Sequence, residues 1–301
     1  MQIQFKSYGD LGRDITKNFE KFSGDWDLVV GVPRSGMVPA YMIALALNIN
    51  CTDISSWVNN YPLRKGLTRC VRKDLSSPWE AQKVLIVDDS IMTGDSIRNE
   101  IDALPDWLAA RASTLAIYSG KPIRSDIDII LEFLPHPRAF EWNIFHHNIM
   151  SRSCICLEGM MMSEKEFGDD TSTTRFRYLP SRDIDTIVTS QNESSRHEVE
   201  ALLMANGVSY HNLIMDKKNN NVMTMDSLVK FKTETYVAST AELFVEFNSD
   251  QAKIICREAG KPVFCFSDSC IYNPEDQLGA RFAKNKIKLL IWKVANMKLR
   301  W

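Results

Sequence analysis

The sequence lacks several features that would mark other classes of protein. It has no uninterrupted apolar run long enough to span a bilayer, and its amino end, MQIQFKSYGDLGRD, lacks the apolar core of a signal peptide. Its seven cysteines are odd in number and irregularly spaced, which favours reduced thiols over a disulfide framework. The formal net charge of -2 gives no global attraction to nucleic acid or membrane. We therefore expect a cytoplasmic globular protein without membrane association.

Length and patterning indicate two α/β domains. At 301 residues the chain is long enough for two domains. Strand-like apolar runs alternate with helical patterns in both halves, which is typical of parallel sheets with helices on their faces. Pro135 to Pro137 and the mixed segment after them mark a boundary. We predict one domain over residues 1–148 and a smaller one over residues 149–301.

The stretch from Lys83 to Ser96, KVLIVDDSIMTGDS, carries the clearest functional pattern. Residues 84–87 are apolar and branched, which predicts a strand buried on both faces. Asp88 and Asp89 follow at its carboxyl end, where open α/β sheets bind their ligands. Residues 93–96 then offer hydroxyls and a glycine before a helix, whose free N–H groups suit an anion. Because carboxylates suit a polyol or a metal, the pattern predicts a phosphorylated sugar with magnesium.

This stretch resembles the phosphoribosyl pyrophosphate signature of type I phosphoribosyltransferases. That signature has four apolar residues, two acids, three variable residues, Thr-Gly, one variable residue and Thr or Ser, and every anchoring position is filled here. The resemblance implies that Asp88 and Asp89 serve the ribose hydroxyls and Mg²⁺, possibly through ligand or water. It also implies a phosphate cradle made of Met92, Thr93, Gly94, Asp95 and Ser96. Asp95 departs from the glycine often found there, so we expect its side chain to point away.

A second strand-to-helix turn precedes this motif. Residues 27–32 predict a strand and residues 37–47 an apolar helix, with PRSG between them. A glycine lets the backbone approach an oxyanion, and an arginine supplies a delocalised cation. In the resemblance this turn matches the pyrophosphate loop, formed by Pro33, Arg34, Ser35 and Gly36. Arg34 is then a catalytic candidate together with the two acids.

The polar, basic segment 61–80 lies between the two motifs. The family places a flexible loop here that closes over the pyrophosphate, and a basic flap excludes water and neutralises a leaving group. A solvated charged loop is the other interpretation. Arg69 and Lys73 are our candidates for contact with the pyrophosphate. The acceptor region is not identified, because Trp142 near the domain end either lines it or serves in packing.

The second half more faintly resembles a haloacid-dehalogenase-like phosphatase domain with a Rossmann-like sheet. Where that family has Asp-x-Asp-Gly, this chain has Cys156-Leu157-Glu158-Gly159. Later motif positions are matched by Thr189, Lys232 and Glu246, with Phe247 where a second acid is common. A cysteine cannot form the family's aspartyl phosphate, and a thiolate is a poor magnesium ligand. We therefore expect a degenerate site that keeps the fold and has lost hydrolysis.

Two functions follow from these motifs. The first is an enzyme that uses phosphoribosyl pyrophosphate and Mg²⁺ to transfer a phosphoribosyl group to a nitrogen acceptor, a base or nucleotide-like molecule. The alternative is a non-catalytic sensor or effector that binds a phosphorylated ribose. Its second domain, or the basic helix predicted over residues 284–301, would then contact a protein or nucleic-acid partner. The intact first motif favours the enzyme, and we expect a homo-oligomer.

Overall fold

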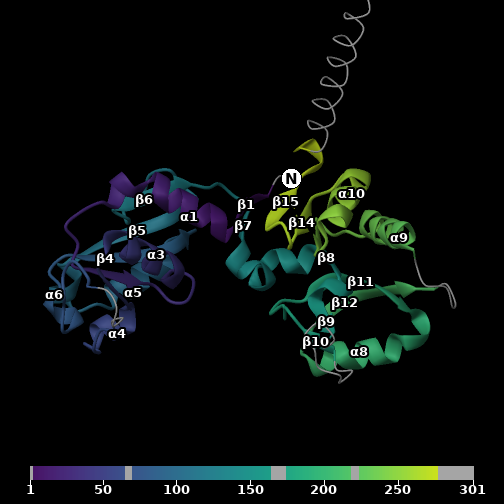
Figure 1. Ribbon diagram of the computed structural model, residues 1–301, viewed down its shortest axis with the longest axis horizontal. Helices are drawn as coiled ribbons and strands as arrows, with labels where there is room; N and C mark the ends of the chain where they lie inside the picture. Colours follow the sequence, from purple (N-terminus) through teal and green to yellow (C-terminus); the bar gives the residue numbers. More distant parts are fainter. Residues whose placement is uncertain (1–2, 65–69, 164–173, 218–223, 277–301) are drawn as a thin grey trace, which may run out of the picture. The chain divides into compact units, whose positions relative to one another are not determined.

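The computed structural model describes residues 3–64, 70–163, 174–217 and 224–276. The chain divides into two compact units, Ile3–Trp142 and a second that begins at Asn143 (Figure 1). The sequence places this boundary at residue 148. The difference arises because the first unit ends with Trp142, which packs on the core of that unit. The predicted basic helix over residues 284–301 lies outside the described residues.

The first unit is built around a five-stranded sheet in the order β3-β2-β4-β5-β6, in which all neighbours pair in parallel. A separate parallel pair, β1 and β7, lies beside it. The strands are β1 (Gln4–Lys6), β2 (Leu28–Gly31), β3 (Asn50–Asp53), β4 (Val84–Ile91), β5 (Ala112–Ser119), β6 (Ile129–Phe133) and β7 (Arg138–Phe140). The helices are α1 (Tyr8–Lys17), α2 (Phe19–Phe22), α3 (Met37–Leu47), α4 (Ile54–Val58), α5 (Asp95–Asp102) and α6 (Asp106–Ala109).

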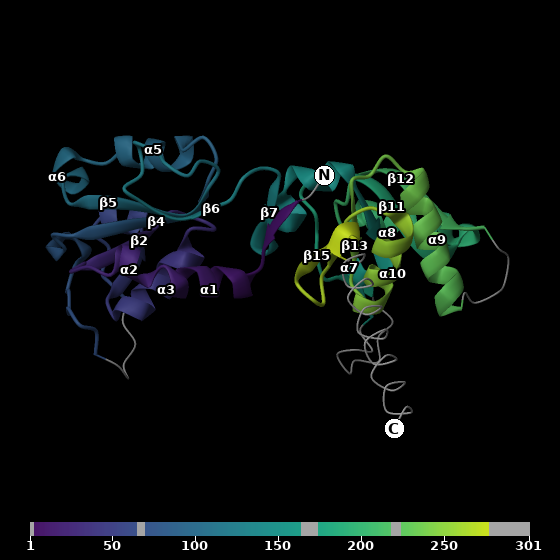
Figure 2. The same ribbon diagram turned by 90° about the horizontal axis from the view of Figure 1, so that it is seen from above.

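Both faces of this sheet are buried. Along β4, Leu85 and Val87 join one hydrophobic cluster with α1 and α3, whereas Val84 and Ile86 join another with α4, α5 and α6. Successive side chains of a strand point to opposite faces, so a run of apolar residues feeds both clusters. The predicted parallel sheet with helices on both faces is therefore confirmed, as Figure 2 shows from a second side.

The strand β4 is longer than the sequence indicates. Its apolar run ends at Val87, but the strand continues through both acids to Ile91, because β5 goes on pairing as far as Ser119. On the other side, β2 stops at Gly31, the partner of Val87. The acids therefore lie within β4 but beyond the end of its neighbour β2, at the carboxyl edge of the sheet.

The second unit has a mixed six-stranded sheet in the order β12-β11-β8-β13-β14-β15. Its elements are β8 (Ser153–Cys156), α7 (Leu157–Met160), β11 (Ile184–Asn192), α8 (Arg196–Ala205), β12 (Tyr210–Asp216), α9 (Met225–Ala238), β13 (Leu243–Glu246), α10 (Ser249–Ala259), β14 (Val263–Cys265) and β15 (Cys270–Tyr272). An antiparallel hairpin of β9 (Met161–Ser163) and β10 (Thr174–Phe176) follows α7.

The second sheet corrects the sequence prediction in one respect. The sequence predicts parallel strands only, whereas β15 pairs antiparallel with β14. The connection between them, residues 266–269, is too short for a crossover and can only form a tight turn. The helices α9 and α10 cover one face of this sheet and bury Tyr236 and Ile255. Within the described part of the chain, no helix has the length and apolar character needed to cross a membrane.

Candidate functional site

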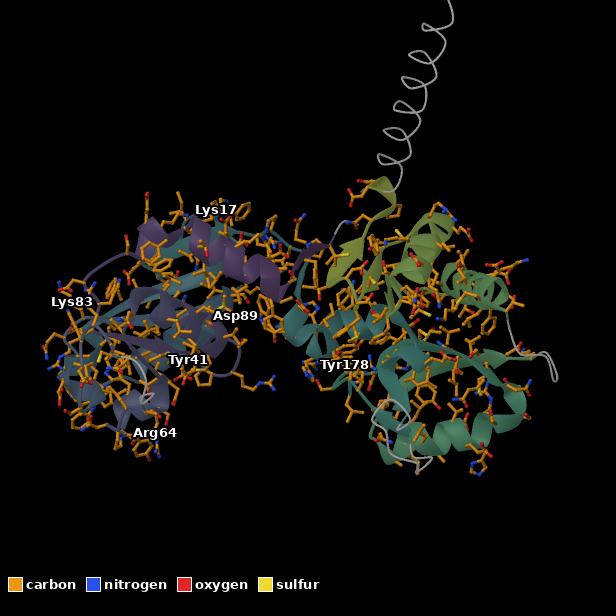
Figure 3. The ribbon with its side chains drawn as sticks, viewed as in Figure 1. Lys17, Tyr41, Arg64, Lys83, Asp89 and Tyr178 are labelled. Atoms are coloured by element: carbon orange, nitrogen blue, oxygen red, sulfur yellow. The ribbon has the colours of Figure 1, made fainter. Side chains whose placement is uncertain are left out.

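Asp88 and Asp89 lie side by side near the end of β4 and are both buried. Asp89 is held from two sides: Ser35 Oγ donates to Oδ1 at 2.7 Å, and Trp142 Nε1 donates to Oδ2 at 2.6 Å. The main-chain N–H of Asp89 donates to Asp88 Oδ1 at 2.9 Å. Figure 3 labels Asp89 within the first unit. All three donors are neutral, and among the described residues no cation forms an ion pair with either acid.

The burial and closeness of the two acids affect the pKa of Asp88. Burial, followed by the neighbouring Asp89, raises the pKa of Asp88 to about 8. Like charges held close together in a buried place disfavour the second ionisation. A cation or a hydroxyl-bearing ligand would therefore bind beside acids that form no ion pair among the described residues, although the buried Arg138 is close enough to interact electrostatically with Asp89.

The turn of residues 33–36 brings the pyrophosphate-loop candidates to the same edge. Ser35 reaches Asp89, and a Cβ on Gly36 would lie 3.0 Å from Asp88 Oδ1 and 2.5 Å from the carbonyl oxygen of Val32. Glycine is therefore required by the space available. The Pro33–Arg34 peptide bond is cis, and Arg34 is exposed. The turn thus joins the acid pair on one side and presents an arginine to solvent on the other.

The cradle candidates follow β4 directly. Met92, Thr93 and Gly94 form the turn, and Asp95 and Ser96 begin α5. Gly94 has φ +90°, a conformation that favours glycine. The Asp95 carboxylate pairs with Arg98 one turn along the helix, at 3.3 Å.

Arg124, in the segment after β5, is a residue that the sequence did not identify. Its guanidinium donates to the carbonyl oxygens of Met92 and Thr93, and it forms an ion pair with Asp126 at 2.6 Å. The side chain is only 6% exposed. No local motif marks it, because an arginine in a polar loop has no periodicity and its partners lie about thirty positions away.

Trp142 contributes to the site, and the sequence left its role open. Besides donating to Asp89, its ring stacks on Phe140, with centroids 4.9 Å apart. An indole N–H is a donor that normally finds a partner when it is buried. Trp142 is therefore both a packing residue and a direct neighbour of the acid pair.

The structure does not bring Lys73 to the acids. Lys73 Nζ lies 2.5 Å from Asp27 and 2.9 Å from Asp25, just before β2 begins, at the amino edge of the sheet. Arg72 also pairs with Asp25, at 2.6 Å, so the aspartates at this edge hold two basic residues of the segment. Arg69, the other loop candidate, lies outside the described residues.

In the second unit, the five predicted positions of the degenerate site form one cluster. Glu158 accepts hydrogen bonds from Cys156 Sγ at 3.1 Å, from Thr189 Oγ1 at 2.8 Å and from Ser190. Lys232 Nζ donates to Glu246 at 2.8 Å and to Gln251 at 2.8 Å. The strands β8, β11 and β13 supply Cys156, Thr189 and Glu246, while the helices α7 and α9 supply Glu158 and Lys232. Parallel strands end at one edge, which explains how distant motif positions meet.

The charged groups of this second cluster all have partners within it. Burial, followed by Glu246, raises the pKa of the Cys156 thiol well above its usual range, so the thiol is neutral. Burial lowers the pKa of Lys232, but the neighbouring Cys156 and Glu246 together more than offset this, and the pKa is raised. Burial raises the pKa of Glu158, but its hydrogen bonds, led by that of Ser190, outweigh burial and lower it. The two carboxylates and the lysine of the cluster therefore already have partners.

Aromatic side chains cover the same edge. Phe247 follows β13 and packs so closely on Gly159 that a Cβ there would meet a ring carbon at 1.8 Å. Phe266 lies 5.4 Å from Phe247 and 4.2 Å from Tyr178, between ring centroids; Tyr178 is labelled in Figure 3. The position where the resembling family often has a second acid therefore holds a ring that fills space.

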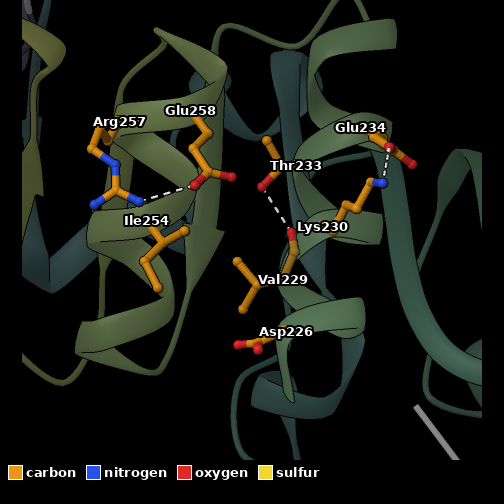
Figure 4. Close-up of a pocket in the computed structure, with 8 residues that line it drawn as sticks. All are labelled: Asp226, Val229, Lys230, Thr233, Glu234, Ile254, Arg257 and Glu258. Carbon is orange, nitrogen blue, oxygen red and sulfur yellow. Dashed lines mark hydrogen bonds and ion pairs between the residues drawn. The ribbon is translucent and has the colours of Figure 1, made fainter. Parts of the chain in front are cut away.

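A pocket between α9 and α10 is separate from both clusters (Figure 4). Val229 and Ile254 form its apolar part. Its charged residues are largely paired with one another, Lys230 with Glu234 and Arg257 with Glu258. This pocket shares no lining residue with the polar cluster at the sheet edge.

Neither edge forms a complete metal cage. Among the described residues, no group of three or more His, Cys, Asp or Glu side chains is arranged to hold a metal ion. Mg²⁺ is commonly bound through one or two carboxylates together with substrate phosphates and water. Asp88 and Asp89 fit that kind of binding, whereas Cys156 and the lysine-paired Glu246 do not.

Comparisons with known proteins concern the first unit. Residues 5–142 match the family model of the phosphoribosyl transferase domain. This match supports phosphoribosyl transfer as the general chemistry of the first unit and is consistent with a transferase. No curated protein matches the chain.

Solved structures also match a part of the chain. A xanthine-guanine-hypoxanthine phosphoribosyltransferase of Helicobacter pylori is 17% identical, over 48% of this chain and 95% of that one, with a TM-score of 0.35. A purine phosphoribosyltransferase of Pyrococcus horikoshii is 20% identical, over 47% and 94%, with a TM-score of 0.33. A hypothetical protein of Neisseria gonorrhoeae with bound ppGpp is 15% identical, over 48% and 91%, with a TM-score of 0.33.

Proposed function

We propose that the first unit binds phosphoribosyl pyrophosphate with Mg²⁺ and transfers the phosphoribosyl group to a nitrogen acceptor, a base or nucleotide-like molecule. The observation that carries this proposal is the meeting of three motifs at one sheet edge. The acid pair on β4 lies between the 33–36 turn, which reaches it through Ser35, and the turn of Met92 to Gly94. The family match over residues 5–142 supports the same chemistry.

The roles of the residues follow from their charges. Asp88 and Asp89 would accept hydrogen bonds from the ribose hydroxyls and stabilise the positive charge that develops on the sugar. Arg34 and the N–H groups of its turn would hold the pyrophosphate as it leaves. When bound, Mg²⁺ would neutralise negative charge on the pyrophosphate, with Asp88 and Asp89 as its protein ligands, directly or through water. No covalent nucleophile is needed, because the reacting groups need only be positioned and their charges neutralised.

The test separates the enzyme from a sensor. Pyrophosphate release from phosphoribosyl pyrophosphate is measured with a panel of bases and nucleotides, beside calorimetric binding without an acceptor, with and without a chelator. Release that requires both an acceptor and Mg²⁺ supports the transferase. Binding without release under every acceptor supports the sensor. Absence of both binding and release contradicts the assignment of the site.

We further propose that the second unit is a haloacid-dehalogenase-like domain without phosphatase activity. Its five consecutive parallel strands lie in the order β12-β11-β8-β13-β14, and a hairpin follows the first of them. This is the kind of parallel sheet that the motif resemblance implies. The inactivity follows from Cys156 at the position of the nucleophile, from the internally satisfied Glu158 and from Phe247 packed on Gly159. The sensor hypothesis draws its support from this unit.

Phosphatase assays on simple phosphate esters test this second proposal. The full chain should show no turnover above background with Mg²⁺. Magnesium-dependent turnover that is lost in Glu158→Gln would show that the second unit is active and that its motif has been assigned wrongly. An unchanged rate in Glu158→Gln would identify the turnover as contamination.

A further inference from the structure

Arg124 lies directly against the turn that follows β4. Its two terminal nitrogens donate to consecutive main-chain carbonyls, NH1 to Met92 O at 3.1 Å and NH2 to Thr93 O at 2.5 Å. A Cβ on Gly94 would lie 2.2 Å from Arg124 NH2. The guanidinium therefore occupies the space that any side chain at position 94 would need. The contact of Arg124 with this turn therefore requires glycine at position 94.

The orientation of these carbonyls fixes the orientation of two N–H groups. A trans peptide unit is planar, with its C=O and its N–H pointing in opposite directions. Since Arg124 holds the C=O groups of Met92 and Thr93, the N–H groups of the same units, on Thr93 and Gly94, point away from it. Within the part of the chain that is described, neither N–H group donates a hydrogen bond. Successive free N–H groups form an anion-binding concavity.

Arg124 is itself held in place. Asp126 accepts from its Nε at 2.8 Å and also forms an ion pair with Arg98 of α5 at 2.8 Å. Arg98 in turn pairs with Asp95 at the start of that helix. Two acids and two arginines thus alternate around the turn, and their formal charges cancel. The chain of ion pairs fixes the backbone of the turn without placing a net charge at the anion site.

We propose that Arg124 is a positioning residue, which turns the N–H groups of Thr93 and Gly94 toward the 5-phosphate of the ligand. This rests on the proposed function, since it assigns the sugar phosphate to this turn and the pyrophosphate to residues 33–36. Arg124 does not touch the ligand; it acts through the backbone. Its loss should weaken binding of the sugar phosphate selectively and leave pyrophosphate binding unaltered.

The experiment compares Arg124→Ala with Arg111→Ala in the full chain. Arg111 is a matched control because it also donates to two carbonyls, those of Trp79 and Ala81, away from the candidate site. Affinities for ribose 5-phosphate and for magnesium pyrophosphate are measured by calorimetry. Arg124→Ala should bind ribose 5-phosphate about 10-fold or more weakly and pyrophosphate as wild type. Arg111→Ala should bind both as wild type.

Three outcomes are informative. Equal affinity of wild type and Arg124→Ala for ribose 5-phosphate overturns the inference, and so does an equal loss for both ligands. If wild type binds neither ligand, it is the proposed function that fails. If Arg124→Ala does not fold, Arg124→Lys is used instead, because it keeps the positive charge but cannot donate to both carbonyl oxygens with the geometry of a guanidinium. A selective, smaller loss for ribose 5-phosphate in that variant supports the inference, and unchanged affinity overturns it.

Discussion

The two sheets of this protein both gather acids at the carboxyl edge, but the two edges differ in how those acids are satisfied. In the first unit, Asp88 and Asp89 receive hydrogen bonds from neutral donors only. In the second, Glu246 is paired with Lys232, and Glu158 is surrounded by hydroxyl, thiol and main-chain donors. At the first edge neither acid has an ion pair among the described residues, whereas at the second edge Glu246 is paired with a lysine and only Glu158 relies on neutral donors.

This difference teaches that acids at a strand end do not by themselves make a site. A buried acid that has no ion pair holds its proton more strongly, as the raised pKa of Asp88 shows. A bound cation or ligand would stabilise the ionised form of such an acid. A buried acid that is paired with a lysine gains little from a ligand, because a ligand that displaced the acid from the pair would leave the lysine buried and unpaired. The predictions below test this contrast.

The largest effect should come from removing the charge at the first edge. Asp88→Asn with Asp89→Asn should weaken phosphoribosyl pyrophosphate binding by about 100-fold or more, since two charge-assisted contacts are lost. The fold should persist, because removing the repulsion between the acids opens no cavity. Calorimetry measures the affinity, and Asp106→Asn, an exposed acid on α6, is the control. Unchanged affinity in the double variant would show that the ligand binds elsewhere.

Substitutions at the second edge should change the stability of the second unit and leave ligand binding by the first unit unaltered. Lys232→Met alone leaves Glu246 buried and unpaired, which should destabilise the second unit by about 3–5 kcal/mol. Lys232→Met with Glu246→Gln removes both charges and should recover much of this loss. Urea unfolding measures both variants. A double variant as unstable as the single one would mean that packing of the lysine chain, and not its charge, matters.

Two glycines at corresponding places sharpen the contrast. Gly36→Ala brings a Cβ against the fixed carbonyl oxygens of Val32 and Val87 and should lower stability by about 1–3 kcal/mol while weakening pyrophosphate binding. Gly159→Ala brings a Cβ against the ring of Phe247 in the second unit and should leave pyrophosphate binding unaltered. Thermal unfolding and calorimetry report both quantities. Equal loss of binding in the two variants would contradict the separation of the edges.

The stability of the first unit should also depend on pH. The pKa of Asp88 is about 8 in the folded protein, above the value of about 4 of an unfolded chain, so the folded state retains a proton that the unfolded state releases. This stabilisation is complete below about pH 4 and is lost as the pH rises through 8. Asp88→Asn, which cannot ionise, should therefore gain stability relative to wild type between pH 5 and pH 9, measured with a chelator present. A constant difference would mean that Asp88 ionises normally.

The sequence by itself determined the elements that depend on neighbours along the chain. A run of apolar residues predicts β4 because a strand buried on both faces needs them at every position. The order of strand, turn and helix around residues 33–36 and 92–96 was predicted because glycine and small polar residues interrupt apolar periodicity. The positions of Cys156, Glu158, Thr189, Lys232 and Glu246 came instead from the resemblance to the motifs of the phosphatase family.

Only the tertiary structure decided which side chains meet. Ser35 and Trp142 reach Asp89, and Arg124 reaches the Met92 to Gly94 turn, across sequence separations that no local pattern encodes. Lys73 pairs with acids at the opposite edge of the sheet because the register of β2 places Asp27 there. The raised pKa of Asp88 depends on burial, which the packing of several elements creates. Local periodicity specifies elements, but charge balance at a sheet edge is a property of distant residues brought together.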